Sequence, residues 1–176
     1  MIELHDFEPR DFQQLIEWIP SPDFLLQWGG PGFTYPLTVS QLENYVDGAN
    51  NDDSSVFVYK VIHKELNKVI GHISLGKLDK KNKSARIGKV LVGDENVRGQ
   101  GIGQHMIEEL LNIAFNQFNL HRVSLGVFEF NKSAIRCYEN AGFKKEGLLR
   151  DYRKNGKEYW SLWEMSILEE EWMGRR

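Results

Sequence analysis

Val90, Leu91 and Val92 form a short apolar run that leads through a glycine-rich turn into a long helical pattern, and this succession constrains the fold most. From Ile102 to Phe118, apolar residues recur at helical spacing, which predicts a helix with a broad apolar face. The apolar run before the turn is typical of a buried strand. We therefore expect a sheet with this helix packed on one of its faces.

Hairpins and strand-helix-strand crossovers alternate along the rest of the chain. Strands are expected at residues 2–7, 56–62, 69–75, 85–92, 122–128, 143–150 and 159–167. Helices are expected at residues 11–19, 38–46, 102–118 and 133–140. Residues 21–36 hold three of the five prolines and a run of glycines, which predicts a loop or lid. This order predicts an α+β fold, with one central mixed sheet flanked by helices.

Composition restricts the class of protein. The chain has 176 residues, of which 41% are hydrophobic, and this predicts a single domain over residues 1–176. A formal charge of −3 disfavours nucleic acid as a partner. The one cysteine, Cys137, excludes an internal disulfide framework and a cysteine-based zinc cluster, and no metal is expected. Without a signal peptide or an apolar run long enough for a membrane span, a cytoplasmic protein is expected.

The turn between the strand and the long helix is suited to binding an anion. Gly99, Gly101 and Gly103 let a ligand approach the backbone, and the first turn of the helix offers N–H groups and the positive end of its dipole. Arg98 adds a charge-assisted donor, so a diphosphate would fit. The same glycines would also serve tight packing alone.

Two common phosphate-binding motifs do not match this turn. A Walker A loop requires Lys and Ser or Thr after its last glycine, whereas Gln104 and His105 follow here. The dinucleotide fingerprint requires Gly-x-Gly-x-x-Gly, whereas these three glycines are evenly spaced. A Rossmann-type nucleotide binder is therefore the least favoured reading.

Two blocks of sequence resemble the GNAT N-acetyltransferase superfamily. Residues 98–103, Arg-Gly-Gln-Gly-Ile-Gly, are similar to its acetyl-coenzyme A signature, (Arg/Gln)-x-x-Gly-x-(Gly/Ala). Residues 131–143 are similar to its block Asn-x-x-Ala-x-x-x-Tyr-x-x-x-Gly-Phe. Within the superfamily the chain most resembles the RimJ/RimL-like branch. The resemblance implies the GNAT fold, with a mostly antiparallel sheet.

The resemblance also implies the roles of particular residues. Those expected to contact acetyl-CoA are Val90, Leu91, Val92, Arg98, Gly99, Gln100, Gly101, Ile102, Gly103 and Asn131. The strand backbone would pair with the pantetheine arm and place an N–H near the thioester oxygen, and the turn would wrap the diphosphate. Tyr138 would act as the catalytic acid at the sulfur. Its alternative reading is an ordinary core tyrosine.

The general base is not identified by the sequence. Relatives often carry Glu at the positions of Arg86 and Gly126, so both usual acids are replaced here. His72, Glu129 or a water chain are the candidates, although His72 is better explained as a structural histidine. An acceptor with a negative group would explain Arg86, but a solvated arginine at a sheet edge explains it better.

Several other side chains have two readings. Cys137 is interpreted as a packed hydrophobe and not as a nucleophile. The aromatic residues of the loop at 21–36 would either wall the acceptor pocket or simply pack on the sheet; they are Trp28, Phe33 and Tyr35. The tryptophans near the C-terminus are expected in the core or at a homodimer interface; they are Trp160, Trp163 and Trp172.

The sequence thus predicts an N-acetyltransferase that passes the acetyl group of acetyl-CoA directly to a primary amine. The acceptor is left open between a protein N-terminus and a small-molecule amine. The alternative is a catalytically silent module that binds coenzyme A.

Overall fold

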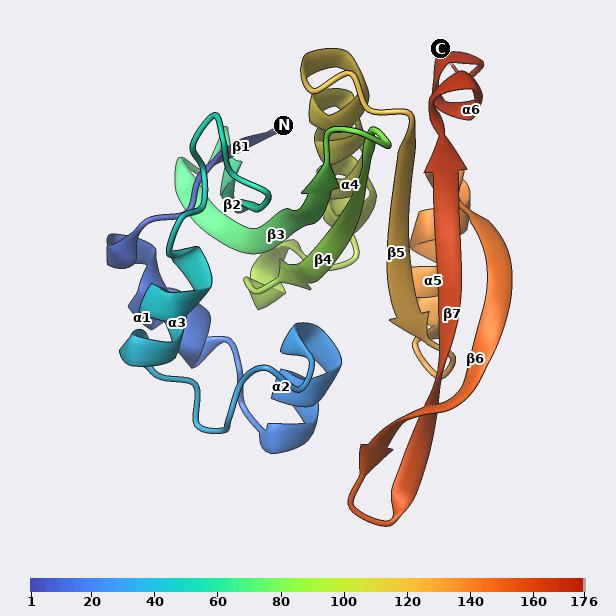
Figure 1. Ribbon diagram of the computed structural model, residues 1–176. Helices are drawn as coiled ribbons and strands as arrows, with labels where there is room; N and C mark the ends of the chain where they lie inside the picture. The colour runs from blue at the N-terminus through green and yellow to red at the C-terminus, as the bar shows by residue number, and fades with distance from the viewer. Residues whose placement is uncertain (176) are drawn as a thin grey trace.

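A computed structural model describes residues 1–175, which form one seven-stranded sheet with helices on both faces (Figure 1). The strands are β1 (Ile2–Asp6), β2 (Phe57–His63), β3 (Lys68–Asp79), β4 (Ser84–Val92), β5 (Arg122–Phe128), β6 (Lys144–Asn155) and β7 (Glu158–Leu168). The helices are η1 (Pro9–Asp11), α1 (Phe12–Glu17), α2 (Pro22–Gly29), α3 (Val39–Val46), η2 (Glu95–Val97), α4 (Ile102–Asn112), η3 (Ile113–Gln117), α5 (Lys132–Asn140) and α6 (Glu169–Met173).

The strand order is β1-β2-β3-β4-β5-β7-β6, and only the contact between β4 and β5 is parallel. This confirms the predicted mixed, mostly antiparallel sheet. The parallel contact is short, since only Ser84–Arg86 pair with Arg122–Ser124. Beyond it the two strands diverge (Figure 1). The sheet is therefore split at its centre, with the backbone of β4 unpaired on the side that faces β5.

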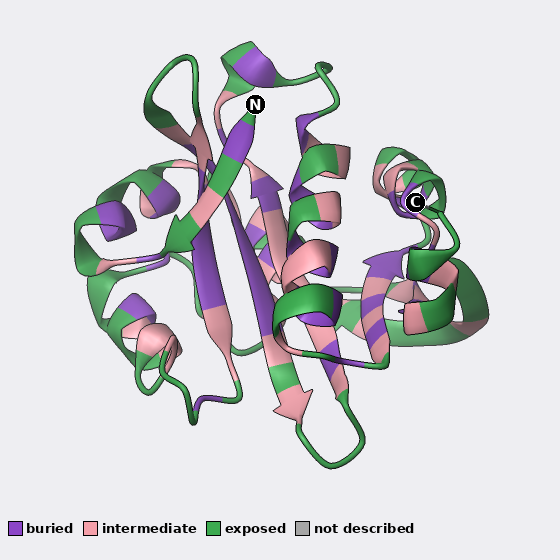
Figure 2. Ribbon diagram, turned by 90° about the horizontal axis from the view of Figure 1, so that it is seen from above, coloured by how far each residue is buried: buried purple, intermediate pink, exposed green. Residues whose placement is uncertain are grey.

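Each face of the sheet has its own apolar core. On one face, α4 contributes Met106, Ile107 and Leu110 to a large cluster that also includes Tyr138 of α5. On the other, α1, α2 and α3 pack over β2 and β4, where Leu91 is buried. Figure 2 shows buried residues along the central strands, between helices on either side. Because side chains alternate along a strand, β4 presents its neighbouring residues to different cores.

The prediction of an irregular segment at residues 21–36 is wrong over its first half. Helix α2 occupies Pro22–Gly29, and the Ser21 hydroxyl caps it by accepting a hydrogen bond from Phe24 N. Proline at the first helical position costs nothing, because its missing N–H would have no partner within the helix. The proline therefore begins this helix instead of preventing it.

Other predicted elements differ from the observed ones at their C-terminal ends. The helix predicted at 102–118 is α-helical to Asn112 and continues as the π-helical turn η3. The strand predicted at 143–150 extends to Asn155, so that β6 and β7 form a long hairpin. Helix α6 was not predicted. The hairpin reaches back toward α2, where Asn155 Nδ2 donates to Asp23 Oδ1 at 3.0 Å.

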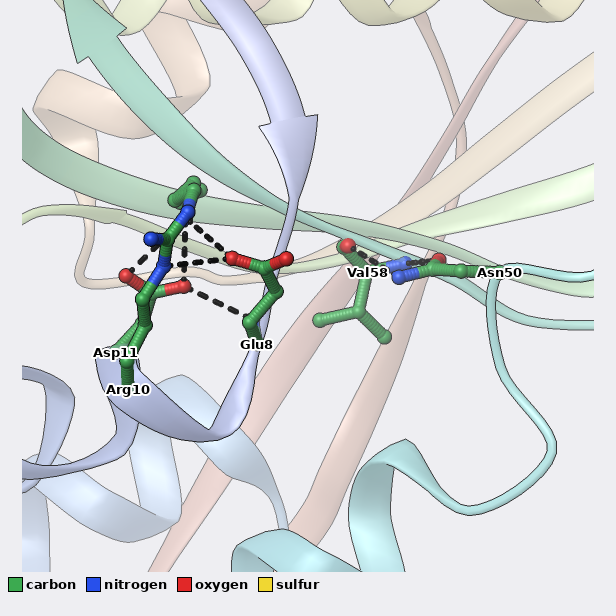
Figure 3. A network of polar contacts seen from close by, with 6 residues as sticks. Glu8, Arg10, Asp11, Asn50 and Val58 are labelled. Carbon is green, nitrogen blue, oxygen red and sulfur yellow. Dashed lines mark hydrogen bonds and ion pairs between the residues drawn. The ribbon is translucent and has the colours of Figure 1, made fainter.

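A polar network holds the segments before α1 and β2 against the sheet (Figure 3). Lys60 of β2 is buried, and its ammonium donates to Asp11 at 3.0 Å and to Glu8 at 3.1 Å. The Asn50 side chain pairs with both backbone groups of Val58. A buried ammonium needs such partners, because an unpaired charge in the interior is strongly destabilising. These contacts hold the segments that lead into α1 and β2 against the sheet.

Candidate active site

Two cavities meet at the split between β4 and β5. The first, which we call the α4-side cavity, has a volume of about 510 Å³ and lies between the start of α4 and α5. The second, the α2-side cavity, has a volume of about 240 Å³ and lies between α2, β4 and β5. The residues that line both cavities are Val90, Val92, Asn131 and Tyr138. A ligand lying in the split would therefore reach from one face of the sheet to the other.

The glycine-rich turn forms the mouth of the α4-side cavity. Gly99 and Gly101 have φ of +78° and +76°, a region that side chains with a Cβ avoid. Gly101 is the N-cap of α4 and has no side chain to cap it, so the N–H groups of the first turn point toward the cavity mouth. Among residues 1–175, those that line this cavity include Arg98 and Arg136 but no carboxylate. The helix dipole and both guanidiniums thus favour an anion here.

Most of the residues predicted to contact acetyl-CoA do line this cavity. They are Val90, Val92, Arg98, Gly99, Gly101, Ile102, Gly103 and Asn131. Two do not: Gln100 turns away and donates to the Asn96 carbonyl, and Leu91 lines only the α2-side cavity. Arg98 Nε also donates to the Val92 carbonyl at 3.2 Å, so the turn is tied to the end of β4.

Asn131 and Tyr138 both lie on α5 or its cap. Asn131 Oδ1 accepts from Ala134 N and caps the helix, which sets Tyr138 two turns further on against the split. Tyr138 is 8% exposed and packs against Phe143. Burial raises the pKa of its phenol, and so the hydroxyl keeps its proton at neutral pH. Tyr138 is thus both a core residue and a wall of the two cavities.

His72 is a structural histidine and does not line either cavity. Its Nδ1 lies 2.9 Å from the Lys89 carbonyl and its Nε2 lies 3.3 Å from the Tyr45 hydroxyl. A carbonyl can only accept, so Nδ1 carries the proton and Nε2 accepts from Tyr45. Burial lowers the pKa of His72 to about 4, which keeps the ring neutral. Of the two explanations, the structure supports the structural one.

The other proposed base, Glu129, is also outside the site. Glu129 is exposed, and its backbone N–H donates to the Ser161 carbonyl on β7. It is absent from the lining of both cavities. Neither side chain offered as a base therefore faces the split.

Arg86 is not a solvated arginine at a sheet edge. Its guanidinium crosses β5 to Glu164 of β7, with N–O distances of 2.5 and 2.9 Å. The pair passes over Gly126, where a Cβ would stand 2.7 Å from Arg86 Nη2. Gly126 lines the α2-side cavity, whereas Arg86 and Glu164 are absent from its lining and line a separate surface pocket. In place of the acids usual at 86 and 126, an ion pair crosses Gly126, and a side chain at 126 would require Arg86 and Leu162 to shift.

Lys89 is the main site residue that sequence reasoning missed. Two residues of β4 oppose one of β3 between the pairs His72–Leu91 and Ser74–Gly88, which makes a bulge. Lys89 lies in it with φ of +52°, and it lines the α2-side cavity. Its ammonium lies over the rings of Tyr45 and Phe33, 5.0 and 5.9 Å from their centroids. Burial is the first cause of a lowered pKa at Lys89.

Further lining residues were also missed. On the α4 side these are Val97, Gln104, Ser133, Ala134, Arg136, Cys137 and Asn140, and on the α2 side Phe24, Gln27, Ile87, Gly88, Leu125, Val127 and Phe128 are among them. The helical spacing of α5 is the signal for three of them, because Ser133, Arg136 and Asn140 share one exposed face of the helix. Burial raises the pKa of the Cys137 thiol, which disfavours a nucleophilic thiolate.

Trp28, Phe33 and Tyr35, the aromatic residues of the segment predicted as a loop at 21–36, lie in three different places. Trp28 lines the α2-side cavity and stacks on Phe33 at 5.8 Å. Phe33 lies behind it and does not line the cavity. Tyr35 is exposed, and its hydroxyl donates to the Pro20 carbonyl. Trp28 alone of the three is a wall residue.

Residues 1–175 were compared with the requirements of a metal site and of a membrane-spanning helix. Within residues 1–175, His, Cys, Asp and Glu side chains nowhere gather in a group of three or more that could hold a metal ion. None of the helices in the same range combines the length and apolar character needed to cross a membrane.

Comparisons with known proteins agree with this architecture. The sequence model of the "Acetyltransferase (GNAT) domain" family matches residues 2–144. The "Uncharacterized N-acetyltransferase p20" of Bacillus licheniformis is 32% identical over 98% of this chain and 96% of its own length. The spermidine N(1)-acetyltransferase of Vibrio cholerae is 28% identical over 65% of each chain.

The fold is also found among solved structures. The crystal structure of spermidine N-acetyltransferase from Vibrio cholerae in complex with CoA and spermine has a TM-score of 0.83 and 21% identity, over 98% of both chains. At that identity the likeness supports the fold. Together with the family match, it confirms the superfamily, whereas the RimJ/RimL-like branch stays a prediction. The chain therefore belongs to the GNAT acetyltransferase family, and it is an acyltransferase that depends on acetyl-CoA.

Proposed function

We propose that this protein transfers the acetyl group of acetyl-CoA directly to a primary amine. The diphosphate would lie at residues 98–103 and the thioester in the split between β4 and β5. The observation that carries the proposal is the meeting of two cavities at Tyr138, one with an anion-binding mouth and one on the opposite face of the sheet. Carrier and acceptor can then approach each other from opposite sides without competing for space.

The residues present fit the carrier by their chemistry. Gly101 leaves the first turn of α4 uncapped, and Arg98 and Arg136 supply positive charge where the diphosphate would bind. Beyond Arg86, β4 has no strand partner on the β5 side, so its backbone can pair with the amides of the pantetheine arm. An N–H of residues 90–92 would donate to the thioester oxygen as charge develops on it.

The reaction needs one proton to leave the amine and one to reach the sulfur. The amine nitrogen attacks the thioester carbonyl carbon, the carbon–sulfur bond breaks, and the Tyr138 hydroxyl donates its proton to the departing sulfur. Because no carboxylate or histidine lines either cavity within residues 1–175, the proton of the amine passes to water through the α2-side cavity. The acceptor would thus react from its neutral form.

Calorimetry of acetyl-CoA binding tests the proposal with a matched pair of variants. Gly101→Glu puts a negative charge at the cavity mouth, and Gly156→Glu puts the same side chain at another left-handed glycine, φ of +62°, in the β6–β7 turn. We expect the first to abolish binding and the second to leave it unchanged. Unaltered binding in Gly101→Glu would contradict the proposed position of the diphosphate.

The sequence also left open a silent module that binds coenzyme A, and the family match speaks against it. What favours it is that no carboxylate or histidine among residues 1–175 lines either cavity. Thiol release over a broad panel of amines separates the two functions. Release above background supports the enzyme, and tight binding with no release for any amine supports the module.

Three finer statements from the sequence stay predictions. They are the class of acceptor, which relatives leave open, the cytoplasmic location and the homodimer.

Of the tryptophans that the sequence assigned to the core or to an interface, Trp172 is buried against Phe115, whereas Trp160 packs on Phe128 and Phe130.

A further inference from the structure

The charge of the α2-side cavity restricts which amine can enter it. Among the described residues that line it, Lys89 carries the only charge at neutral pH. The carboxylate of Glu164 on β7 is engaged by Arg86, so this ion pair adds no net charge. The acceptor cavity is therefore positive.

The Lys89 ammonium packs against aromatic rings and forms no ion pair with a carboxylate within residues 1–175. Within residues 1–175 no ion pair to Lys89 occurs, and the groups that face its ammonium are the rings of Phe33 and Tyr45. His72 fixes the bulge at Lys89 through the backbone carbonyl, so the side chain starts from a defined point. A half-buried cation at a cavity wall that lacks a counterion attracts an anion.

A second donor lies in the same wall. The indole Nε1 of Trp28 is buried and makes no hydrogen bond in the described part of the chain, although Trp28 is only 9% exposed and lines the cavity. Buried N–H groups normally have an acceptor, and one without a partner calls for an explanation such as a missing ligand. Lys89 and Trp28 can both only donate, and a carboxylate can only accept.

We propose that the acceptor is a primary amine that carries a carboxylate, which Lys89 binds with the help of the Trp28 indole N–H. This inference rests on the proposed acetyl transfer. It makes Lys89 a residue that determines specificity and positions the acceptor, without a part in the chemistry. A polyamine is disfavoured, since its further ammonium groups would find Lys89 but no carboxylate among the described lining residues.

Matched acceptors that differ only in the carboxylate test the proposal. The pairs are 5-aminopentanoate with pentylamine, L-phenylalanine with phenethylamine, and L-lysine with cadaverine, and spermidine is included. In the wild-type enzyme we expect kcat/KM to be at least about tenfold higher for a carboxylate-bearing member than for its partner, as for loss of one charge-assisted hydrogen bond.

Lys89→Met removes the charge and keeps the length of the side chain. It should abolish the preference, mainly through KM of the carboxylate-bearing amine, while KM of acetyl-CoA is unchanged. Trp28→Phe replaces the indole by a smaller ring that has no N–H, and it should reduce the preference. Lys83→Met is the control, because Lys83 is exposed, has φ of +54° like Lys89, and lines neither cavity.

Binding of the reaction products separates this inference from the proposed function. N-acetylphenylalanine and N-acetylphenethylamine are titrated against the protein saturated with coenzyme A. Tighter binding of the first, lost in Lys89→Met, supports the inference even if no amine is acetylated, in which case only the proposed function fails. Equal turnover within every pair and equal product binding would overturn the inference, as would a preference for spermidine, even if acetyl transfer is observed.

Discussion

Arg86 and Glu164 form a bidentate ion pair that spans β5, with N–O distances of 2.5 and 2.9 Å, and the guanidinium lies over the bare backbone of Gly126. The two side chains come from strands on either side of the split sheet, β4 and β7. The pair therefore ties the two halves of the sheet together at the point where β4 and β5 begin to diverge.

Glu164→Gln should lower the free energy of unfolding by about 1–2 kcal/mol. The pair is roughly three-quarters buried, so its loss lies between the small effect of an exposed pair and the large effect of a fully buried one. Chemical denaturation measures the change. Glu146→Gln, which breaks the more exposed pair with Arg122, is the control and should cost less than about 1 kcal/mol. An equal cost in both variants would contradict the structural role of the Arg86–Glu164 pair.

Tyr138→Phe should lower kcat by about a hundredfold and leave the affinity for acetyl-CoA unchanged. The phenol supplies the proton for the departing sulfur, and general acid catalysis typically contributes about 10²–10⁴-fold. Steady-state kinetics and calorimetry measure the two quantities. Tyr59→Phe removes a hydroxyl from β2, outside both cavities, and should leave kcat unchanged. A Tyr138→Phe enzyme with full activity would leave Tyr138 as a core residue only.

The rising limb of the pH dependence of kcat/KM should follow the acceptor and not the enzyme. His72 has a pKa of about 4 and stays neutral above it, and the raised pKa of Tyr138 keeps its phenol protonated. Below the pKa of the amine the rate should rise about tenfold per pH unit, because the neutral fraction does. Two acceptors with different amine pKa values should therefore give displaced profiles. One shared inflection between pH 6 and 7 would reveal a base on the protein.

His72 should make the protein less stable as pH falls from about 6.5 toward about 4. The unfolded histidine binds a proton in this window and the buried ring does not, so protonation favours the unfolded state. The contribution is complete above about pH 6.5 and amounts to about 3 kcal/mol.

Unfolding free energies at pH 4.5 and 7.5 measure this effect. In His72→Gln the difference between the two pH values should shrink by most of that amount. His121→Gln changes an exposed histidine and should leave the difference as it is in the wild type. A His72→Gln protein with the same pH dependence as the wild type would contradict a neutral, buried ring.

Local patterns were sufficient for much of this fold. The β5 strand was predicted at its observed ends, because its apolar residues alternate between clear polar boundaries. The α2 helix was missed because the prolines and glycines of residues 21–36 were interpreted as a loop, although Ser21 is a good cap and Pro22 suits the first helical position. The end of β6 was missed because its charged residues after Arg150 show no alternation, since that part of the hairpin lies outside the core.

The site was predictable where it is contiguous and not where it is assembled from distant segments. The turn at 98–103 and the α5 block each lie in one stretch of sequence, and both line the α4-side cavity. The position of Lys89 could not be predicted, because its ammonium packs on Phe33 and Tyr45, which are distant in the sequence. Likewise, nothing near Arg86 in the sequence indicates that its partner is Glu164.

The crystal structure of the protein in complex with acetyl-CoA is the most direct test of the central claim, which is that the carrier passes through the split between β4 and β5. We expect its diphosphate against the N–H groups of residues 98–103 and its sulfur within hydrogen-bond distance of the Tyr138 hydroxyl. Density for the diphosphate elsewhere, or a thioester outside the split, would contradict the proposed site and the transfer derived from it.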